Sequence, residues 1–208
     1  MKKIIAMLLC FGLLFAASGC RQIVDEPMDA KPVIYLYPEE ETEVTVTLEY
    51  NGRLTHSYPD YQNGWTVTAH PDGTLVDETG REYYCLFWEG ISHTEYDLSK
   101  GFVVAGKETA AFLEEALSAL GLTEKEANEF IIYWLPQMEH SPYNLITFQT
   151  EAYTETAKLH ISPAPDSLLR VFMVWKPLEG PIDIPAQELY SPPRTGFTAV
   201  EWGGKKLS

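Results

Sequence analysis

The side chains of this chain that are best suited to proton transfer gather in one short segment. Within nine residues it holds Glu89, His93, Glu95 and Asp97. A histidine between carboxylates can exchange protons with a substrate or bind a divalent cation, but this spacing matches no closed zinc pattern. An ordinary polar loop after a strand explains the same residues more simply. We therefore predict no metal site and treat Glu89, His93 and Asp97 only as candidate catalytic residues.

Glu89 has the most specific chemical alternative in this segment. The ring of Trp88 beside it would desolvate the carboxylate and disfavour its charged form. A glycosidase needs a second carboxylate at a fixed separation, and Glu95 or Asp97 could be that partner. The alternative function is thus a hydrolase that acts on envelope or external polymers. The chain has no Gly-x-Ser-x-Gly elbow, phosphate loop or dinucleotide fingerprint, so we predict no cofactor and disfavour an enzyme.

Aromatic residues crowd the first half of the chain and offer a second kind of site. They are Tyr35, Tyr37, Tyr58, Tyr61, Trp65, Tyr83, Tyr84 and Trp88. Such side chains combine a large apolar area with a polar tip, so they suit both cores and recognition surfaces. A core position explains most of them. Trp65 and Trp88 are the candidate binding residues, for a sugar ring or for a peptide.

The N-terminus indicates where the protein resides. Lys2 and Lys3 precede an apolar run over residues 4–17, which is too short to cross a bilayer. The run ends in Ala17-Ser18-Gly19-Cys20, which resembles the lipobox of bacterial lipoproteins. The resemblance implies that residues 1–19 are a signal peptide and that Cys20 carries the lipid. We expect a protein anchored on the extracytoplasmic face of the cell membrane, or in the outer membrane if the cell has two.

Charge limits the partners of the protein. The chain has 15 Lys and Arg against 30 Asp and Glu, for a formal net charge of -15. Nucleic-acid binding needs basic surface against phosphate, so this composition argues against it. The expected partners are the membrane, through lipid on Cys20, and a glycan or an envelope protein. After signal removal Cys85 is the remaining unmodified thiol, which we expect to be a small buried residue rather than a catalytic thiolate.

The elements before residue 107 have β-strand patterns. Residues 20–32 read as a tether, and residues 33–106 as a β-rich region in which 33–90 form an antiparallel meander. Alternation over 43–50 predicts a half-buried strand. The following Asn51-Gly52 predicts a hairpin with a three-residue loop or a bulge. Residues 82–88 are apolar on both faces, which predicts a central strand.

The second region, residues 107–208, combines helices and strands. Residues 107–120 predict a helix ended by Gly121, and 124–134 a second helix that Pro136 ends. Thr123 and Glu126 are spaced as a capping box between them. Strands are expected over 144–149, 157–161, 168–175 and 198–202, with an ordered connection over 177–193. The predicted fold is α+β, an antiparallel meander region followed by an αα-hairpin packed on further antiparallel strands. Residues 33–208 could form one domain.

A family resemblance covers nearly the whole mature chain. The segment Lys31-Pro32-Val33-Ile34-Tyr35-Leu36-Tyr37-Pro38-Glu39 is its most distinctive part. It is similar to a segment of a group of uncharacterised bacterial lipoproteins. The resemblance implies a secreted, anchored protein and supplies neither an activity nor catalytic residues. We therefore predict a binding or envelope-interaction module. The hydrolase is the alternative, and a purely structural lipoprotein is the third hypothesis.

Overall fold

A computed structural model describes residues 28–208 of the chain, so the predicted signal peptide and Cys20 lie outside the described residues. The strands are β1 (Met28–Tyr37), β2 (Thr42–Tyr50), β3 (Arg53–Tyr58), β4 (Trp65–Ala69), β5 (Leu75–Val76), β6 (Glu82–Tyr83), β7 (Leu86–Ile91), β8 (Phe102–Ala105), β9 (Tyr143–Phe148), β10 (Ala157–Ser162), β11 (Ser167–Leu178) and β12 (Thr198–Lys206). The helices are the short 3-10 helix η1 (Gly106–Glu108) and the α-helices α1 (Thr109–Ala119), α2 (Glu124–Met138) and α3 (Thr150–Thr156).

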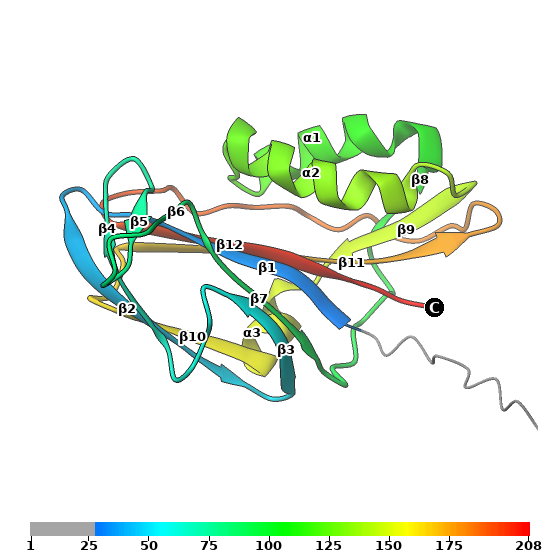
Figure 1. The fold of residues 1–208 in the computed structure, drawn as a ribbon. Coiled ribbons are helices and arrows are strands. Elements are labelled where there is room, and N and C mark those ends of the chain that lie inside the picture. Colours follow the sequence, from blue (N-terminus) through cyan, green and yellow to red (C-terminus); the bar gives the residue numbers. More distant parts are fainter. Residues whose placement is uncertain (1–27) are drawn as a thin grey trace, which may run out of the picture.

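These elements form three layers, and a seven-stranded sheet is the middle one (Figure 1). The strand order of this sheet is β3-β7-β1-β12-β11-β9-β8, and a second sheet has the order β10-β2-β4-β5-β6. Helices α1 and α2 cover one face of the large sheet, while the small sheet and α3 cover the other. The predicted α+β class is confirmed. No helix in the described part of the chain is long and apolar enough to cross a membrane.

The first described strand lies in the interior of the large sheet, between β7 and β12. β1 begins at Met28, so the last five residues of the predicted 20–32 tether belong to the sheet instead. Val33 faces the core under the helices and Ile34 faces the core between the sheets. Because β1 is buried on both faces, its apolar run is continuous rather than alternating. Its neighbour β12 pairs with β11 in parallel, so the strands after the helices are not all antiparallel.

The hairpin predicted at Asn51-Gly52 is wrong. β2 pairs with β10 and β4 in the small sheet, whereas β3 pairs with β7 at the edge of the large sheet. The chain crosses between layers at this corner, and a Cβ on Gly52 would lie 2.6 Å from Cε1 of Tyr50. Gly52 is therefore needed for a close approach and not for a hairpin turn.

The strand predicted over residues 82–88 is also divided between the two sheets. β6 pairs with β5 in the small sheet, and β7 pairs with β1 and β3 in the large one. The chain changes sheets at Tyr84 and Cys85. The β-prone run therefore crosses from one layer to the other, and the continuous meander expected for residues 33–90 is realised only locally, from β4 to β6.

The helical hairpin is confirmed, with one difference at its end. Thr123 Oγ1 accepts the Glu126 N–H, and Glu126 accepts the Thr123 N–H at 2.8 Å, which is the predicted capping box. Helix α2 continues through Pro136 to Met138. Met138 is fully buried, and Asn144 Nδ2 donates to its carbonyl oxygen at 3.0 Å. Burial and this side-chain cap hold the last turn despite the proline. Helix α3 lies in a range for which the sequence analysis predicted no element.

The final strand is longer than expected because two glycines lie inside it. β12 continues past Trp202 through Gly203 and Gly204 to Lys206. A Cβ on Gly204 would lie 2.7 Å from Cζ2 of Trp134 and 2.6 Å from the Met173 carbonyl oxygen. Glycine at this position allows the Trp134 indole of α2 to pack directly on the backbone of the sheet. The Gly-Gly pair is thus a packing feature and not a flexible end.

Candidate functional site

The acidic segment after β7 does not form one cluster. Glu89 lies on β7, where its Oε1 accepts the Lys31 N–H at 3.2 Å and its Oε2 lies 3.5 Å from His56 Nδ1. Asp97 accepts the Ser99 N–H at 2.8 Å, which lowers the pKa of its carboxyl, and His93 and Glu95 are exposed. Glu89 and Asp97 thus have separate partners. Within residues 28–208 no three His, Cys, Asp or Glu side chains gather to hold a metal.

The two candidate binding tryptophans are inside the protein. Trp65 is 3% exposed and donates its Nε1–H to the Pro59 carbonyl oxygen at 2.8 Å. Trp88 is 0% exposed and donates its Nε1–H to Glu201 Oε1 at 3.2 Å. Neither ring can stack on a ligand at the surface, so this prediction is wrong. Trp65 is on a strand with an alternating pattern, which does not say which face is covered, and Trp88 ends an apolar run that suits a core as well as a surface.

Cys85, the cysteine within the described residues, is buried and has no disulfide partner. Burial, with the nearby Glu129 carboxylate, raises the pKa of its thiol to about 11. The thiol is therefore protonated at neutral pH and is a poor nucleophile. The prediction of a small buried residue is confirmed.

A strained bulge in β1 marks the most unusual surface position. Lys31 has a φ of 61°, and it is the non-glycine residue with positive φ in the described part of the chain. A proline follows it, which further restricts its backbone. Such a conformation costs about 1–3 kcal/mol and persists where neighbours enforce it. Here Glu89 binds its N–H, and Gly203 lets β12 approach, because a Cβ there would lie 3.1 Å from Pro32.

The bulge places the Lys31 side chain over two aromatic rings. Its Nζ lies 5.3 Å from the ring centroid of Phe87 and 5.7 Å from that of Tyr133, on α2. Both distances are those of cation–π contacts. Lys31 Nζ makes no hydrogen bond to any described residue, so its donors remain available. We call the group formed by Lys31, His56, Tyr58, Phe87, Glu89 and Tyr133 the Lys31 platform.

Strand register puts the four members of the Lys31 platform that are on β3 and β7 on one face of the sheet. In the pairing of β3 with β7, His56 is opposite Glu89 and Tyr58 is opposite Phe87. Residues directly opposite each other in an antiparallel pair share a face of the sheet. Tyr58 is 50% exposed, whereas Phe87 and Tyr133 are half-buried against the core under the helices. The platform therefore combines ring area, an ammonium group and a carboxylate beside α2, at the edge of the large sheet.

The tyrosines of the 31–39 segment extend from the platform under α2. Tyr35 and Tyr37 are stacked, with ring centroids 6.3 Å apart. Tyr35 donates its hydroxyl to Glu129 Oε2 at 2.7 Å, and burial raises the pKa of this hydroxyl. Arg194 lies over the Tyr37 ring at 5.4 Å. The distinctive segment thus docks α2 on the sheet.

Buried ion pairs are the feature that sequence reasoning missed. Glu126 accepts both Nη1 and Nη2 of Arg194, at 2.7 and 3.1 Å. Glu201 accepts Arg170 Nε at 2.6 Å. Lys205 Nζ lies 3.0 Å from Asp29 Oδ1. The partners are 31 or more residues apart in the chain, so no local spacing could have indicated them.

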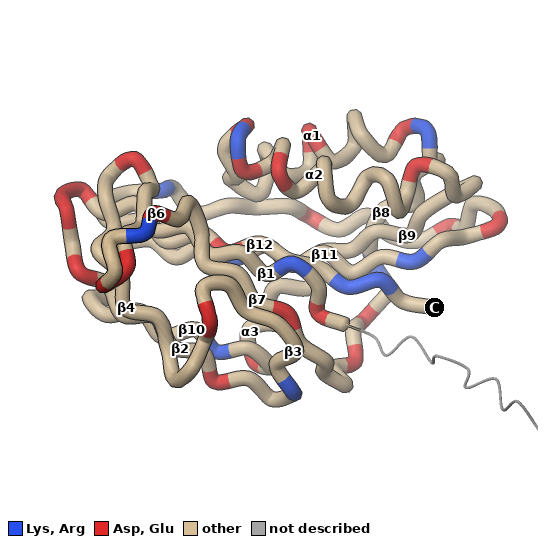
Figure 2. Tube along the Cα trace, in the orientation of Figure 1, with Lys and Arg blue, Asp and Glu red and all other residues tan. Residues whose placement is uncertain are grey.

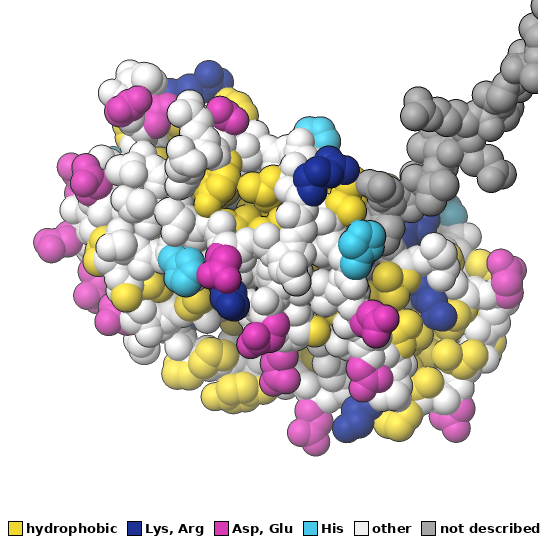
Figure 3. Space-filling model, turned by 90° about the horizontal axis from the view of Figure 1, so that it is seen from below, with side chains coloured by type: hydrophobic (Ala, Val, Ile, Leu, Met, Phe, Trp, Pro, Cys, Tyr) yellow, Lys and Arg dark blue, Asp and Glu magenta, His cyan; other side chains and the backbone are white. Residues whose placement is uncertain are grey.

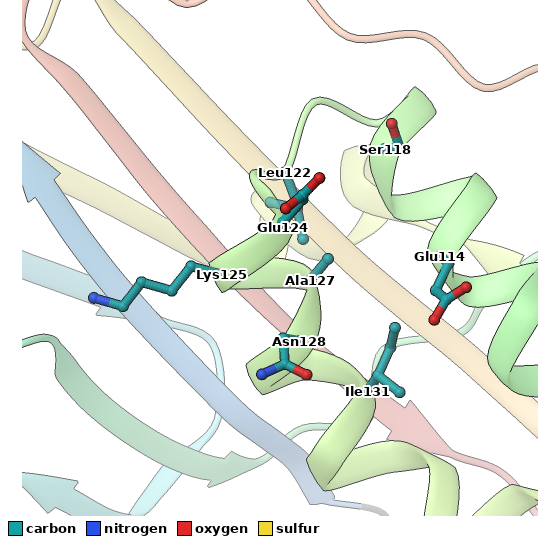
Figure 4. A pocket seen from close by; sticks show the side chains of 8 residues that line it. All are labelled: Glu114, Ser118, Leu122, Glu124, Lys125, Ala127, Asn128 and Ile131. Atoms are coloured by element: carbon teal, nitrogen blue, oxygen red, sulfur yellow. The ribbon is translucent and has the colours of Figure 1, made fainter.

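A hollow of 790 Å³ lies between α1 and α2 on the outer side of the helices (Figure 4). Its lining residues are Glu114, Ser118, Leu122, Glu124, Lys125, Ala127, Asn128 and Ile131. The polar ones are exposed residues of the helix surface, and Lys125 extends away from α1. No described residue points a buried polar group into the hollow. It is a groove between two helices without a built polar site.

Charge is distributed over the described surface without a basic patch. Lys and Arg lie among more numerous Asp and Glu along the trace, with the consecutive Lys205 and Lys206 near the C-terminus (Figure 2). On the face seen from below, acidic side chains lie between apolar ones with isolated cations (Figure 3). Several of the cations already form ion pairs within the protein, such as Arg170 and Lys205 in the core. This distribution favours an uncharged or weakly charged ligand over a polyanion.

Comparisons with known proteins give one informative match. A Butyrivibrio fibrisolvens protein named "Uncharacterized protein in bglA 3'region" is 43% identical over 94 residues, which are 43% of this chain and 97% of that protein. No family model matches the chain. No solved structure matches it significantly. The matched name carries no activity.

Proposed function

This chain belongs to the same family as the Butyrivibrio fibrisolvens protein, and from the geometry of its own large sheet we propose that it is a lipid-anchored binding module on the extracytoplasmic face of the membrane. Its binding surface is the Lys31 platform, and its ligand is a glycan of the cell envelope. The strained conformation of Lys31 is the observation that carries this proposal, because strain of this kind is held in place where a side chain must be positioned.

The chemistry of the platform supports a sugar ligand. A pyranose ring has an apolar C–H face and a rim of hydroxyl groups. Tyr58 and Phe87 offer ring area for the first. The Lys31 ammonium can donate to hydroxyl oxygens, and the Glu89 carboxylate can accept from hydroxyl groups. Because the surface is a sheet face and not a deep pocket, it suits an extended polymer that lies across it.

Replacing Tyr58 with alanine is expected to weaken glycan binding about 2- to 12-fold, because an exposed stacking ring contributes about 0.5–1.5 kcal/mol beyond its buried area. Tyr58 is 50% exposed and lies at an edge strand, so its removal should leave the fold intact. The measurement is co-sedimentation of the purified protein with insoluble cell-wall polysaccharide over a range of polymer concentrations.

Tyr190→Ala is the matched control. Tyr190 is 78% exposed and lies in the segment between β11 and β12, outside the platform. We expect this variant to bind like the unchanged protein. Equal losses in both variants would mean that exposed tyrosines bind the polymer non-specifically. No loss in Tyr58→Ala would remove the platform as the binding surface.

The anchoring part of the proposal depends on Cys20. Cys20→Ala should abolish retention in the membrane fraction or leave the signal uncut, since covalent lipid is the expected means of attachment. Metabolic labelling of the cells with a fatty acid, followed by fractionation, measures both effects. Cys85→Ala is the control and should remain labelled. A Cys20→Ala protein that is still processed and membrane-bound would refute lipid anchoring while leaving the platform untouched.

A further inference from the structure

The buried pair Lys205 and Asp29 lies where the two ends of the described chain meet. Ala30 on β1 pairs with Gly204 on β12, so the preceding Asp29 and the following Lys205 stand opposite each other. Asp29 is 0% exposed and Lys205 is 1% exposed. Lys205 Nζ lies 3.0 Å from Asp29 Oδ1. An amine and a carboxyl group thus stand in contact, shielded from water, between the first and the last described strand.

Each donor of the Lys205 ammonium has a defined partner. Two of the acceptors belong to Ser92: its carbonyl oxygen lies 3.0 Å from Nζ, and its Oγ lies 3.1 Å from Nζ. The third is Asp29 Oδ1. If the third proton moves to Oδ1, the two remaining N–H bonds stay on Ser92, and the neutral amine stays in contact with the Asp29 carboxyl group. The nucleophile is thus held beside the group that it would attack, as a reaction within one molecule requires.

The second carboxyl oxygen of Asp29 is also held. Tyr50 donates its hydroxyl to Oδ2 at 2.6 Å. A hydrogen bond to this oxygen stabilises the negative charge that develops there when a nucleophile adds to the carbonyl carbon. Gly90 and Gly52 leave the space that the Tyr50 ring occupies, since a Cβ on either would overlap it. The fold therefore positions Tyr50 against Asp29 through two glycines.

We propose that Lys205 and Asp29 become joined by an amide bond when the protein folds. The ammonium transfers a proton to Oδ1, and Nζ forms a bond to Cγ. A second proton passes from the nitrogen to the same oxygen, the Cγ–Oδ1 bond breaks, and water leaves. The product keeps one N–H to donate to Ser92 and the oxygen Oδ2 that Tyr50 binds. One ammonium and one carboxylate yield one amide and one water, so atoms and charge balance without any co-reactant.

The surroundings favour this condensation over a permanent ion pair. Two buried charges carry a desolvation penalty that their attraction offsets only in part, and an amide carries no net charge. Water released by the reaction leaves a site with almost no exposure, so hydrolysis lacks its reactant. The bond would join β1 to β12 beside the point where the chain leaves for the proposed lipid anchor. The proposal does not depend on the ligand of the Lys31 platform.

Peptide mapping of the purified full-length protein tests the bond. Trypsin cleaves after Lys205 only if its amine is free. We expect residues 195–206 to appear joined to residues 22–53, with a mass lower than the sum of the two by one water molecule. A peptide 195–205 with a free Lys205, recovered from protein that shows a cooperative unfolding transition, would overturn the proposal.

Two controls keep the result specific. The exposed pair Lys158 and Glu49 has a separation of 3.3 Å, similar to that of the buried pair, and trypsin should still cleave after Lys158, so that residues 126–158 appear as a free peptide in the same digest. Lys205→Arg retains the positive charge and should yield only free peptides. If this variant fails to fold, the map of the unchanged protein still decides. Cross-linked peptides from both pairs would indicate an artefact of preparation and would refute a site-specific reaction.

Discussion

Arg170→Met should lower the free energy of unfolding by about 3–5 kcal/mol, because it leaves the Glu201 carboxylate buried without its counter-ion. Glu201 is 0% exposed, and the Arg170 side chain is 7% exposed. Methionine keeps most of the length and packing of the arginine stem, so the loss reports the charge and its hydrogen bonds. The measurement is equilibrium unfolding in urea, followed by tryptophan fluorescence, with the midpoint and slope fitted separately.

The matched control is Lys158→Met, which removes one partner of the exposed Lys158–Glu49 pair. An exposed pair contributes about 0–1 kcal/mol, so this variant should unfold almost like the unchanged protein. The double variant Arg170→Met with Glu201→Gln should recover part of the loss, because the unpaired charge is gone. If Arg170→Met lost no more stability than Lys158→Met, the buried pair would not be essential to the core.

Gly204→Ala is expected to destabilise the protein by about 1–3 kcal/mol through overpacking. The added Cβ would lie 2.6 Å from the Met173 carbonyl oxygen and 2.7 Å from Cζ2 of Trp134. One of these neighbours is backbone in the next strand and the other is a buried indole, so neither can move freely. Thermal unfolding by circular dichroism measures the change, and loss of near-ultraviolet signal would report the displaced indole.

Gly180→Ala is the control for this substitution. A Cβ on Gly180 would have nothing within 4 Å, and Gly180 follows the last residues of β11 in a connection without helix or strand. Its stability should be unchanged within about 0.5 kcal/mol, as for surface substitutions generally. A destabilised Gly180→Ala with an unaffected Gly204→Ala would contradict the close approach of α2 to β12.

Local signals in the sequence predicted the elements well where one pattern decided the structure. The capping box of Thr123 and Glu126 located the start of α2, and alternation located β2. Such patterns could not indicate strand pairing or contacts between residues that are remote in the sequence. Asn51-Gly52 has the composition of a hairpin turn, yet the two strands beside it enter different sheets, and Gly52 lies in close contact with Tyr50. The continuation of α2 through Pro136 likewise depends on Asn144, a residue outside the helix.

The candidate site was predictable only in part. Glu89 was identified from its place after an apolar run, and it does hold the strained Lys31. Its true neighbours, His56 and Lys31, come from β3 and β1, which lie beside β7 through strand order alone. Trp65 and Trp88 were wrong because aromatic type does not report burial. The carboxylates and cations of the core carry no local signature, since each partner is remote in sequence.

The position of β12 has a consequence for biogenesis. β12 is the last strand of the described residues, and it is inserted between β1 and β11, in the interior of the large sheet. A nascent chain therefore cannot complete this sheet until residues 198–206 have been synthesised. Polypeptides that end prematurely, before residue 198, would lack this strand and expose both hydrophobic cores to proteolysis.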